Sequence, residues 1–155
     1  MVSFNRQTSG IQRFPEPHNY LRSTQPGSFL NTSYTFAKDS HPVEPEATGI
    51  GTGKKFLQRG EVLAKITSGA DAGKVGVFQL EATDGRQTAA NIVGINRTFA
   101  PWELNERDVD VAADYTASVV AAWVTIRDAS GARVPVTADV ISAMDDRTDL
   151  NITWK

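Results

Sequence analysis

The sequence predicts a mainly β domain with one short helix, a β-rich α+β fold, preceded by a long extended N-terminal arm. From residue 56 onward, short segments with alternating apolar and polar side chains are separated by glycine-rich turns. Near the C-terminus, one stretch carries apolar residues at helical spacing. The first 48 residues hold five of the seven prolines and few Leu, Ile or Val residues. Because such a segment buries too little apolar area to offset the entropy of ordering, about 1–2 kcal/mol per residue for the backbone, we divide the chain into an arm, residues 1–48, and a domain, residues 49–155.

Composition excludes several classes of function. The formal net charge is −2, so bulk electrostatics favour neither nucleic acid nor an anionic membrane as a partner. No apolar run approaches the roughly 18 residues that a membrane-spanning helix needs. The absence of cysteine excludes disulfides, thiol nucleophiles and Cys-ligated metals. The N-terminus lacks the apolar core of a secretory signal, so we expect synthesis in the cytoplasm, and no cofactor is predicted.

Aromatic residues recur along the arm, which is unusual for a flexible linker. They are Phe4, Phe14, Tyr20, Phe29, Tyr34 and Phe36. Residues 31–37 alternate as a strand does, and this strand could add to the edge of a partner's sheet. The aromatics either dock on a partner or pack back onto the protein's own domain. We favour docking because the arm is long and poor in aliphatic residues.

Two apparent motifs in the first 55 residues do not carry a site. His18 and His41 lie far apart in the sequence without a third ligand at ligand spacing, so no metal is predicted there. Residues 48–55, TGIGTGKK, resemble a phosphate-binding loop but lack its first glycine and the hydroxyl residue after the lysine. We interpret this stretch as a hinge between the arm and the domain.

The first part of the domain predicts a β hairpin followed by a buried strand. Residues 61–67 and 75–82 alternate as strands, and the glycine-rich turn 68–74 separates them. Asp84-Gly85 marks a second turn, and the small apolar residues of 88–95 predict a strand. The loop 98–110 follows, with an acidic cluster that could bind a metal or serve a hydrolase through Glu103, Asp108 or Asp110. Since its spacing matches no calcium motif and no histidine lies in the domain, we predict neither a metal site nor an enzyme.

The second part of the domain predicts a strand, a short helix and a terminal strand. Residues 114–127 form the most apolar run, and its second half is apolar on both faces. A small domain cannot cover both faces, so we expect another subunit to cover one of them. The candidate interface residues are Trp102, Val120, Ala122, Val124 and Ile126. Residues 135–147 predict a helix that either Thr137 or Pro135 can begin, and residues 151–155 predict a strand.

Three segments together resemble the head decoration (cement) proteins of tailed bacteriophages, the phage lambda protein D-like family. They are residues 57–66, LQRGEVLAKI; residues 73–78; and residues 84–95, DGRQTAANIVGI. The order of elements after them fits as well, and the resemblance covers residues 50–155 but not the arm.

This resemblance implies a compact β-tulip fold and assembly as a homotrimer at three-fold positions on the outer surface of the virion capsid. The partner is then the major capsid (coat) protein, and the role is to stabilise the expanded head against the pressure of packaged DNA. An N-terminal arm that becomes ordered on the capsid fits the aromatic residues above. The alternative is another virion surface module, such as a head fibre base or a carbohydrate- or receptor-binding protein. That alternative predicts exposed aromatic residues on the domain, with Trp102 as the residue to test.

Overall fold

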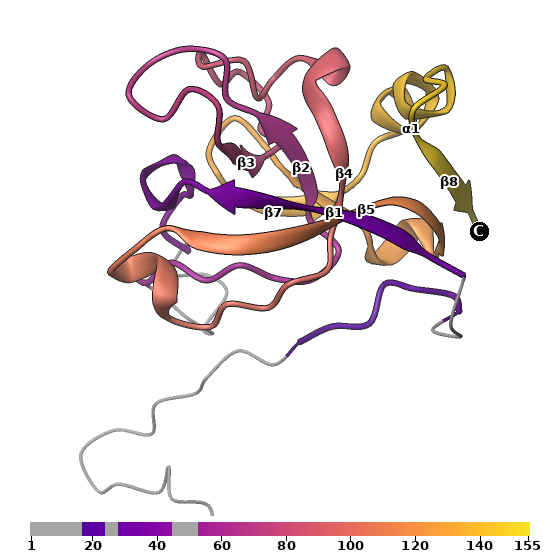
Figure 1. Ribbon diagram of the computed structural model, residues 1–155, viewed down its shortest axis with the longest axis horizontal. Coiled ribbons are helices and arrows are strands. Elements are labelled where there is room, and N and C mark those ends of the chain that lie inside the picture. The colour runs from indigo at the N-terminus through magenta and orange to yellow at the C-terminus, as the bar shows by residue number, and fades with distance from the viewer. Residues whose placement is uncertain (1–16, 24–27, 45–52) are drawn as a thin grey trace, which may run out of the picture.

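A computed structural model describes residues 17–23, 28–44 and 53–155. Its main sheet closes into a five-stranded β-barrel in the order β1-β3-β2-β4-β5, because β1 also pairs with β5, and β8 adds to the outside of β5. Figure 1 shows this arrangement, with α1 and β8 together at one side. The strands are β1 (Leu30–Phe36), β2 (Val62–Lys65), β3 (Val75–Val77), β4 (Ile92–Asn96), β5 (Val109–Val119), β6 (Thr125–Arg127), β7 (Arg133–Pro135) and β8 (Asn151–Trp154). The prediction of a mainly β fold with one helix is confirmed.

The predicted hairpin is confirmed. β2 and β3 pair antiparallel, with Leu63 opposite Val77. The second strand ends earlier than expected, at Val77 rather than residue 82, because the following residues pair with Arg127 of β6: its amide donates to the carbonyl of Phe78, and the amide of Leu80 donates to its carbonyl. β4 pairs with the other edge of β2, and it begins at Ile92, after a 3-10 turn over Ala89–Asn91.

The predicted strand 114–127 is wrong as a single element. β5 begins earlier, at Val109, and ends at Val119, where a 3-10 turn over Ala121–Trp123 separates it from β6. The amide of Ala121 donates to the carbonyl of Lys155 at 2.9 Å, so the break lies beside the chain's last residue. β6 then pairs with β7 in a separate two-stranded ribbon. The apolar run 114–127 is therefore divided between β5 of the main sheet and β6 of the two-stranded ribbon.

The helix and the last strand agree with the sequence. α1 spans Ala138–Asp145, and the side chain of Thr137 caps it by accepting from the amide of Val140. Val140 and Met144 lie on the buried face of the helix and join the larger of two core clusters. β8 runs parallel to β5, with Ile152 opposite Ala117.

The boundary between arm and domain at residue 48 requires correction for the residues that the structure describes. β1, from the predicted arm, lies in the barrel wall, with seven residue pairs to β5 that run from Leu30–Thr116 to Phe36–Val109. Tyr20, Leu21, Phe36 and Ala37 are all buried. These residues find their apolar partners in the domain rather than among themselves, so the poverty of the segment in aliphatic residues did not prevent its packing.

Candidate functional site

The structure divides the six arm aromatics into different environments. Phe4 and Phe14 lie outside the described residues. Tyr20 and Phe36 are 2% and 0% exposed, and they belong to the two core clusters. Phe29 and Tyr34 are half-buried against those clusters. The expectation that Tyr20 and Phe36 dock on a partner is therefore wrong, because their rings are enclosed by the protein's own barrel.

Tyr20 is held by a buried polar contact. Its hydroxyl donates to Oδ2 of Asp114 at 2.5 Å, and Arg97 donates from Nε to Oδ1 of the same carboxylate at 3.1 Å. Asp114 is fully buried in β5, and the Arg97 guanidinium lies 3.5 Å from the centroid of the Phe29 ring. Burial, followed by the charge of Asp114, raises the pKa of Tyr20, so its hydroxyl stays a donor. Tyr20 and Phe29 thus both contact the ion pair between Asp114 and Arg97, Tyr20 through the carboxylate and Phe29 through the guanidinium.

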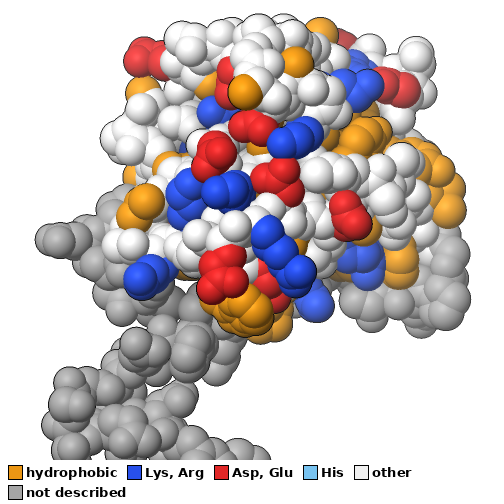
Figure 2. All heavy atoms as spheres, turned by 60° about the vertical axis from the view of Figure 1, so that its left-hand side comes forward, with side chains coloured by type: hydrophobic (Ala, Val, Ile, Leu, Met, Phe, Trp, Pro, Cys, Tyr) orange, Lys and Arg blue, Asp and Glu red, His pale blue; other side chains and the backbone are white. Residues whose placement is uncertain are grey.

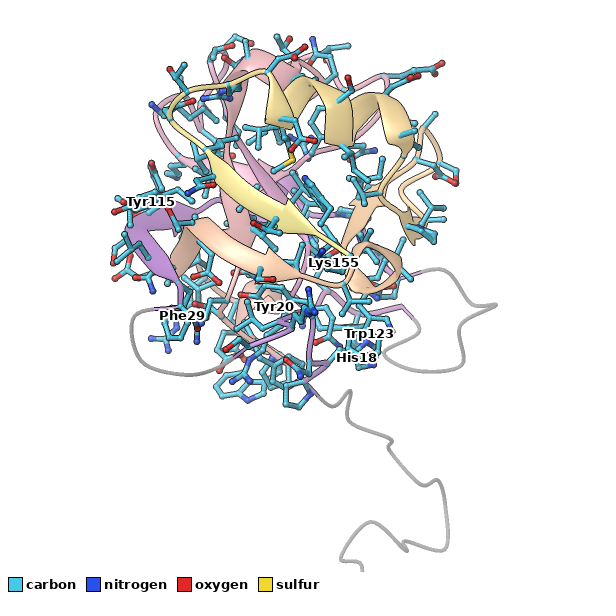
Figure 3. The ribbon with its side chains drawn as sticks, turned by 90° about the vertical axis from the view of Figure 1, so that its right-hand side faces the viewer. His18, Tyr20, Phe29, Tyr115, Trp123 and Lys155 are labelled. Carbon is cyan, nitrogen blue, oxygen red and sulfur yellow. The ribbon has the colours of Figure 1, made fainter. Side chains whose placement is uncertain are left out.

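The backbone around Tyr20 fixes the direction in which the chain enters the domain. Leu21 forms an antiparallel bridge with Val119, and the amides of Arg22 and Val120 donate to the carbonyls of Ser118 and Tyr20 at 2.8 and 3.0 Å. In Figure 3, His18 and Trp123 project from the same end of the molecule, just below Tyr20. Residues 20–22 are therefore held at a defined place, next to the break between β5 and β6.

The predicted strand within residues 31–37 exists, but it pairs inside this chain. β1 pairs with β5 along its whole length, but with β3 only through Phe36 opposite Val75, so its second edge is not paired with β3 over residues 30–35. Its side chains are mostly exposed, and only Phe36 is fully enclosed. The edge facing β5 is taken within this chain, whereas addition to a partner's sheet at the other edge stays a prediction.

The five interface candidates differ in exposure, and the 3-10 turn over Ala121–Trp123 separates the four aliphatic ones. Val124 and Ile126 are fully buried in the larger core cluster, so they cannot form an interface with another subunit. Trp102 is 51% exposed, Ala122 is exposed and Val120 is half-buried. Strand alternation placed all four aliphatic candidates on one face, and the 3-10 turn rotates them apart.

The sequence missed Trp123 as a surface residue. It lies in the 3-10 turn and is 52% exposed. Alternation along a continuous strand would have placed its ring on a covered face, and nothing in the sequence marks the turn. Trp123 at 52% and Trp102 at 51% are exposed to the same degree as Val43 and Leu30, and they are the largest of the exposed hydrophobic side chains among the described residues.

A buried charge cluster, Glu44, Glu61, Arg127, Arg133 and His41, was also missed. Arg127 is fully buried and donates to three oxygens: Oε1 of Glu44 at 2.6 Å, Oε1 of Glu61 at 2.9 Å and the carbonyl of Gly131 at 3.1 Å. Arg133 contacts the same two carboxylate oxygens at 3.0 and 3.3 Å. Glu44 lies between Pro42 and Pro45, in a segment that the sequence marks as extended. Charged residues beside short strands are common, so no sequence signal connects these five positions.

His41 completes the cluster in its neutral form. Its Nε2 lies 2.7 Å from the carbonyl of Phe56 and 3.3 Å from Nη2 of Arg127. The shorter contact requires a proton on Nε2, which leaves Nδ1 as a buried acceptor without a partner. Burial, with Arg127 and Arg133 nearby, lowers the pKa of His41 to about 3 against the opposing charge of Glu61. Burial raises the pKa of Glu61, but the two guanidiniums outweigh this and bring it to about 2.

The acidic residues of loop 98–110 do not form one site. Asp108 accepts from Nζ of Lys74 at 2.8 Å and from the amide of Lys38 at 2.9 Å, and the Lys74 hydrogen bond is the largest influence lowering its pKa. Asp110 instead accepts a hydrogen bond from the hydroxyl of Thr35, and Glu103 accepts one from the amide of Trp102. A general base with a raised pKa is therefore not found at Asp108. Figure 2 shows acidic and basic side chains interspersed on one face.

An open hollow of about 370 Å³ lies between β1, β4 and the loop before β8. Tyr34 and Tyr115 line it together with Lys65 and Arg147. Arg147 is occupied, because it forms an ion pair with Asp149 and donates to the carbonyls of Ala89, Ala90 and Ile92. Its guanidinium therefore serves to hold the helix end against the turn before β4.

No group of three or more His, Cys, Asp or Glu side chains arranged to hold a metal ion occurs within the described ranges. Among the same residues, no helix is long and apolar enough to cross a membrane. Comparisons with protein-family models, with curated proteins and with solved structures found no match.

Proposed function

We propose that the protein is a capsid decoration protein of tailed bacteriophages, with a β-tulip domain of the phage lambda protein D-like type. It binds as a homotrimer at three-fold positions on the outer surface of the expanded head, contacts the major capsid protein and stabilises the shell against internal DNA pressure. It is a binding protein rather than an enzyme.

One observation carries this proposal: the segments with the family resemblance form a single structural unit. Residues 57–66, 73–78 and 84–95 include β2, β3 and most of β4, which lie side by side in the order β3-β2-β4. Residues that resemble one family and also pack together are better support than scattered matches, because one shared backbone shape accounts for all of them.

Glycines in the resembling segments lie where that shape requires them. Gly60 has a φ of +86°, and a Cβ there would come within 2.9 Å of the carbonyl oxygen of Trp123. Gly94 has a φ of +148°, and a Cβ would come within 2.4 Å of the carbonyl oxygen of Asp114. Larger residues fit neither position. The pattern "RG" followed by "VGI" thus reports a backbone path as well as a sequence likeness.

The surface supports a binding role at the end of the molecule where the described chain begins. Trp123 is half-exposed there, and Tyr20 and Leu21 anchor the entering segment to the end of β5. Exposed tryptophans are enriched at protein interfaces because they bury a large area with little loss of side-chain entropy. A segment attached beside such a residue can engage the same partner.

Attachment by a trimer is multivalent. Each subunit that binds holds its neighbours at high local concentration, so the avidity can exceed the affinity of one subunit by about 10²–10⁴. Binding only to the expanded shell would stabilise that state by mass action. Both effects depend on non-covalent contacts alone and require no catalysed reaction.

The decisive experiment measures binding to expanded capsids of the phage that encodes this protein. The full chain should bind and raise the temperature at which capsids disrupt. A chain lacking residues 1–16 should stay folded and bind much more weakly. Deletion should stop at residue 16, because removal of residues 1–48 would take away β1, Tyr20 and Glu44 and destroy the barrel. Full-strength binding by the shortened chain would refute the role of the arm.

Subunit association is tested on Trp102, an interface candidate that is exposed, and on Trp123, the exposed tryptophan that the structure adds. Trp102→Ala and Trp123→Ala should each weaken trimers or capsid binding, as measured by light scattering and cosedimentation. Leu80→Ala is the matched control, because Leu80 is exposed but lies in a different loop. A protein that remains monomeric on the capsid in a cryo-EM map would contradict the proposed assembly.

The alternative virion surface module keeps one supporting observation. Trp102 is exposed on the domain, as a carbohydrate- or receptor-binding protein would require. If Trp102→Ala abolished adhesion to host cells and left capsid attachment unchanged, this second function would be favoured.

A further inference from the structure

Residues 37–44, here called the strap, hold the barrel closed between β1 and β3. These two strands share only one residue pair, Phe36 with Val75, and the amide of Ala37 extends it with a bond of 2.9 Å to the Val75 carbonyl. β1 is otherwise paired with β5. This seam therefore has the fewest paired residues of any in the barrel, and the strap begins directly beside it.

The far end of the strap is held by charge. Glu44 accepts from Arg127 and Arg133 at 2.6 and 3.0 Å, and His41 donates to the Phe56 carbonyl at 2.7 Å. The His41 ring also meets the Phe36 ring edge-on, with centroids 5.4 Å apart. His41 thus touches both the buried charge cluster and the last residue of β1.

The cluster has no place for another positive charge. The groups that face His41 are Glu44 on the strap, Glu61 before β2, Arg127 on β6 and Arg133 on β7, and their formal charges cancel. Nδ1 of His41 and Oε2 of Glu44 are both buried without a hydrogen-bond partner. A proton added at Nδ1 would be an unsatisfied donor and an uncompensated buried charge, which is among the costliest states in a protein interior.

We infer that the strap is an acid-sensitive latch: uptake of a proton by His41 is compatible only with a strap displaced from the charge cluster, and its displacement opens the barrel between β1 and β3. Leaving the cluster returns the imidazole to water, where it accepts the proton. The consequence is a local opening that exposes the edge of β3 and the ring of Phe36. It is independent of the function proposed above.

The direction in which the open fraction changes with pH follows from the difference in proton binding between the two forms. The closed form holds His41 neutral with a pKa of about 3, and the open form has the ordinary value of 6.5. The open form therefore binds one more proton between these values, and acid favours opening. Between pH 7.5 and pH 5, the open fraction should rise about 30-fold, a range that lies above the titration of ordinary carboxyls.

A single engineered thiol measures this opening in the full chain, which contains no cysteine. Ala37 is fully buried in the seam, so Ala37→Cys should react with 4,4′-dithiodipyridine only when the strap opens. After correction for the reactivity of a cysteine peptide at each pH, reaction should accelerate about 30-fold from pH 7.5 to pH 5. In the same protein with His41→Gln, which keeps a donor toward Phe56, the change should be under about 3-fold.

Three outcomes would overturn the inference. The first is an equal acceleration in both proteins. The second is a urea dependence of labelling that matches global unfolding, because the strap would then not open by itself. The third comes from the unaltered chain. ¹⁵N NMR should show His41 neutral with its proton on Nε2 at pH 5. A protonated His41 in the folded protein at that pH would show that the closed strap tolerates the added charge, with Nδ1–H donating to Glu44.

Discussion

Replacement of Arg127 by Met tests whether the buried charge cluster holds the fold. The substitution keeps a long apolar side chain of similar reach and removes the guanidinium. Three hydrogen bonds disappear, to Glu44, Glu61 and the carbonyl of Gly131. Both carboxylates remain fully buried, and Arg133 is then their remaining cationic partner in the described structure.

The expected loss of folding stability follows from the cost of leaving one charge of a buried ion pair without its partner. Removal of one partner of a fully buried pair destabilises by about 3–5 kcal/mol, because the other charge stays without compensation. Arg133 moderates the loss, since it already contacts both carboxylates and is 18% exposed. We expect Arg127→Met to lower the free energy of unfolding by about 3 kcal/mol, a large part of the roughly 5–15 kcal/mol typical of a domain.

The assay is urea unfolding followed by the fluorescence of the three tryptophans at pH 7.5. Arg107→Met is the matched control, because Arg107 is exposed, and it should change the free energy by no more than about 0.5 kcal/mol. Arg127→Lys should lose about 2 kcal/mol, since an ammonium cannot reproduce the planar fork that reaches both carboxylates. A loss under about 1 kcal/mol for Arg127→Met would refute the reasoning, because it would mean that the carboxylates are hydrated or neutralised without cost.

Three further predictions concern stability. Tyr20→Phe removes the donor to the buried Asp114 carboxylate and should cost about 2 kcal/mol in the same urea assay; an unchanged midpoint would show that the contact is not made in solution. Gly94→Ala should cost more than about 3 kcal/mol or prevent folding, because its Cβ would clash with backbone, whereas Gly53→Ala, with nothing within 4 Å, should cost only about 1 kcal/mol. The depressed pKa of Glu61 predicts a contribution to folding that is complete above about pH 4.5 and lost as the pH falls toward 2, and unfolding free energies measured across that range would contradict this if they stayed constant.

Local patterns predicted local elements well. The Thr137 cap and the apolar spacing through Val140 and Met144 predicted α1, because capping and helical periodicity depend on residues a few positions apart. Alternation around a glycine turn predicted the β2–β3 hairpin for the same reason. By contrast, the apolar run after Val119 has no local mark of its break, which depends on where Tyr20 and Lys155 place their carbonyls.

The sequence alone determined that this is a mainly β protein with one helix, no cysteine chemistry and a proline-rich N-terminal region. Only the tertiary structure decided that Tyr20 and Phe36 are core residues, that β1 closes the barrel, and that Glu44, Glu61 and Arg127 share one buried cluster. The physical reason is that burial and ion pairing are properties of residues brought together from distant parts of the chain. A segment too poor in apolar residues to fold alone can complete a barrel when the rest of the domain supplies the pocket and the opposite charge.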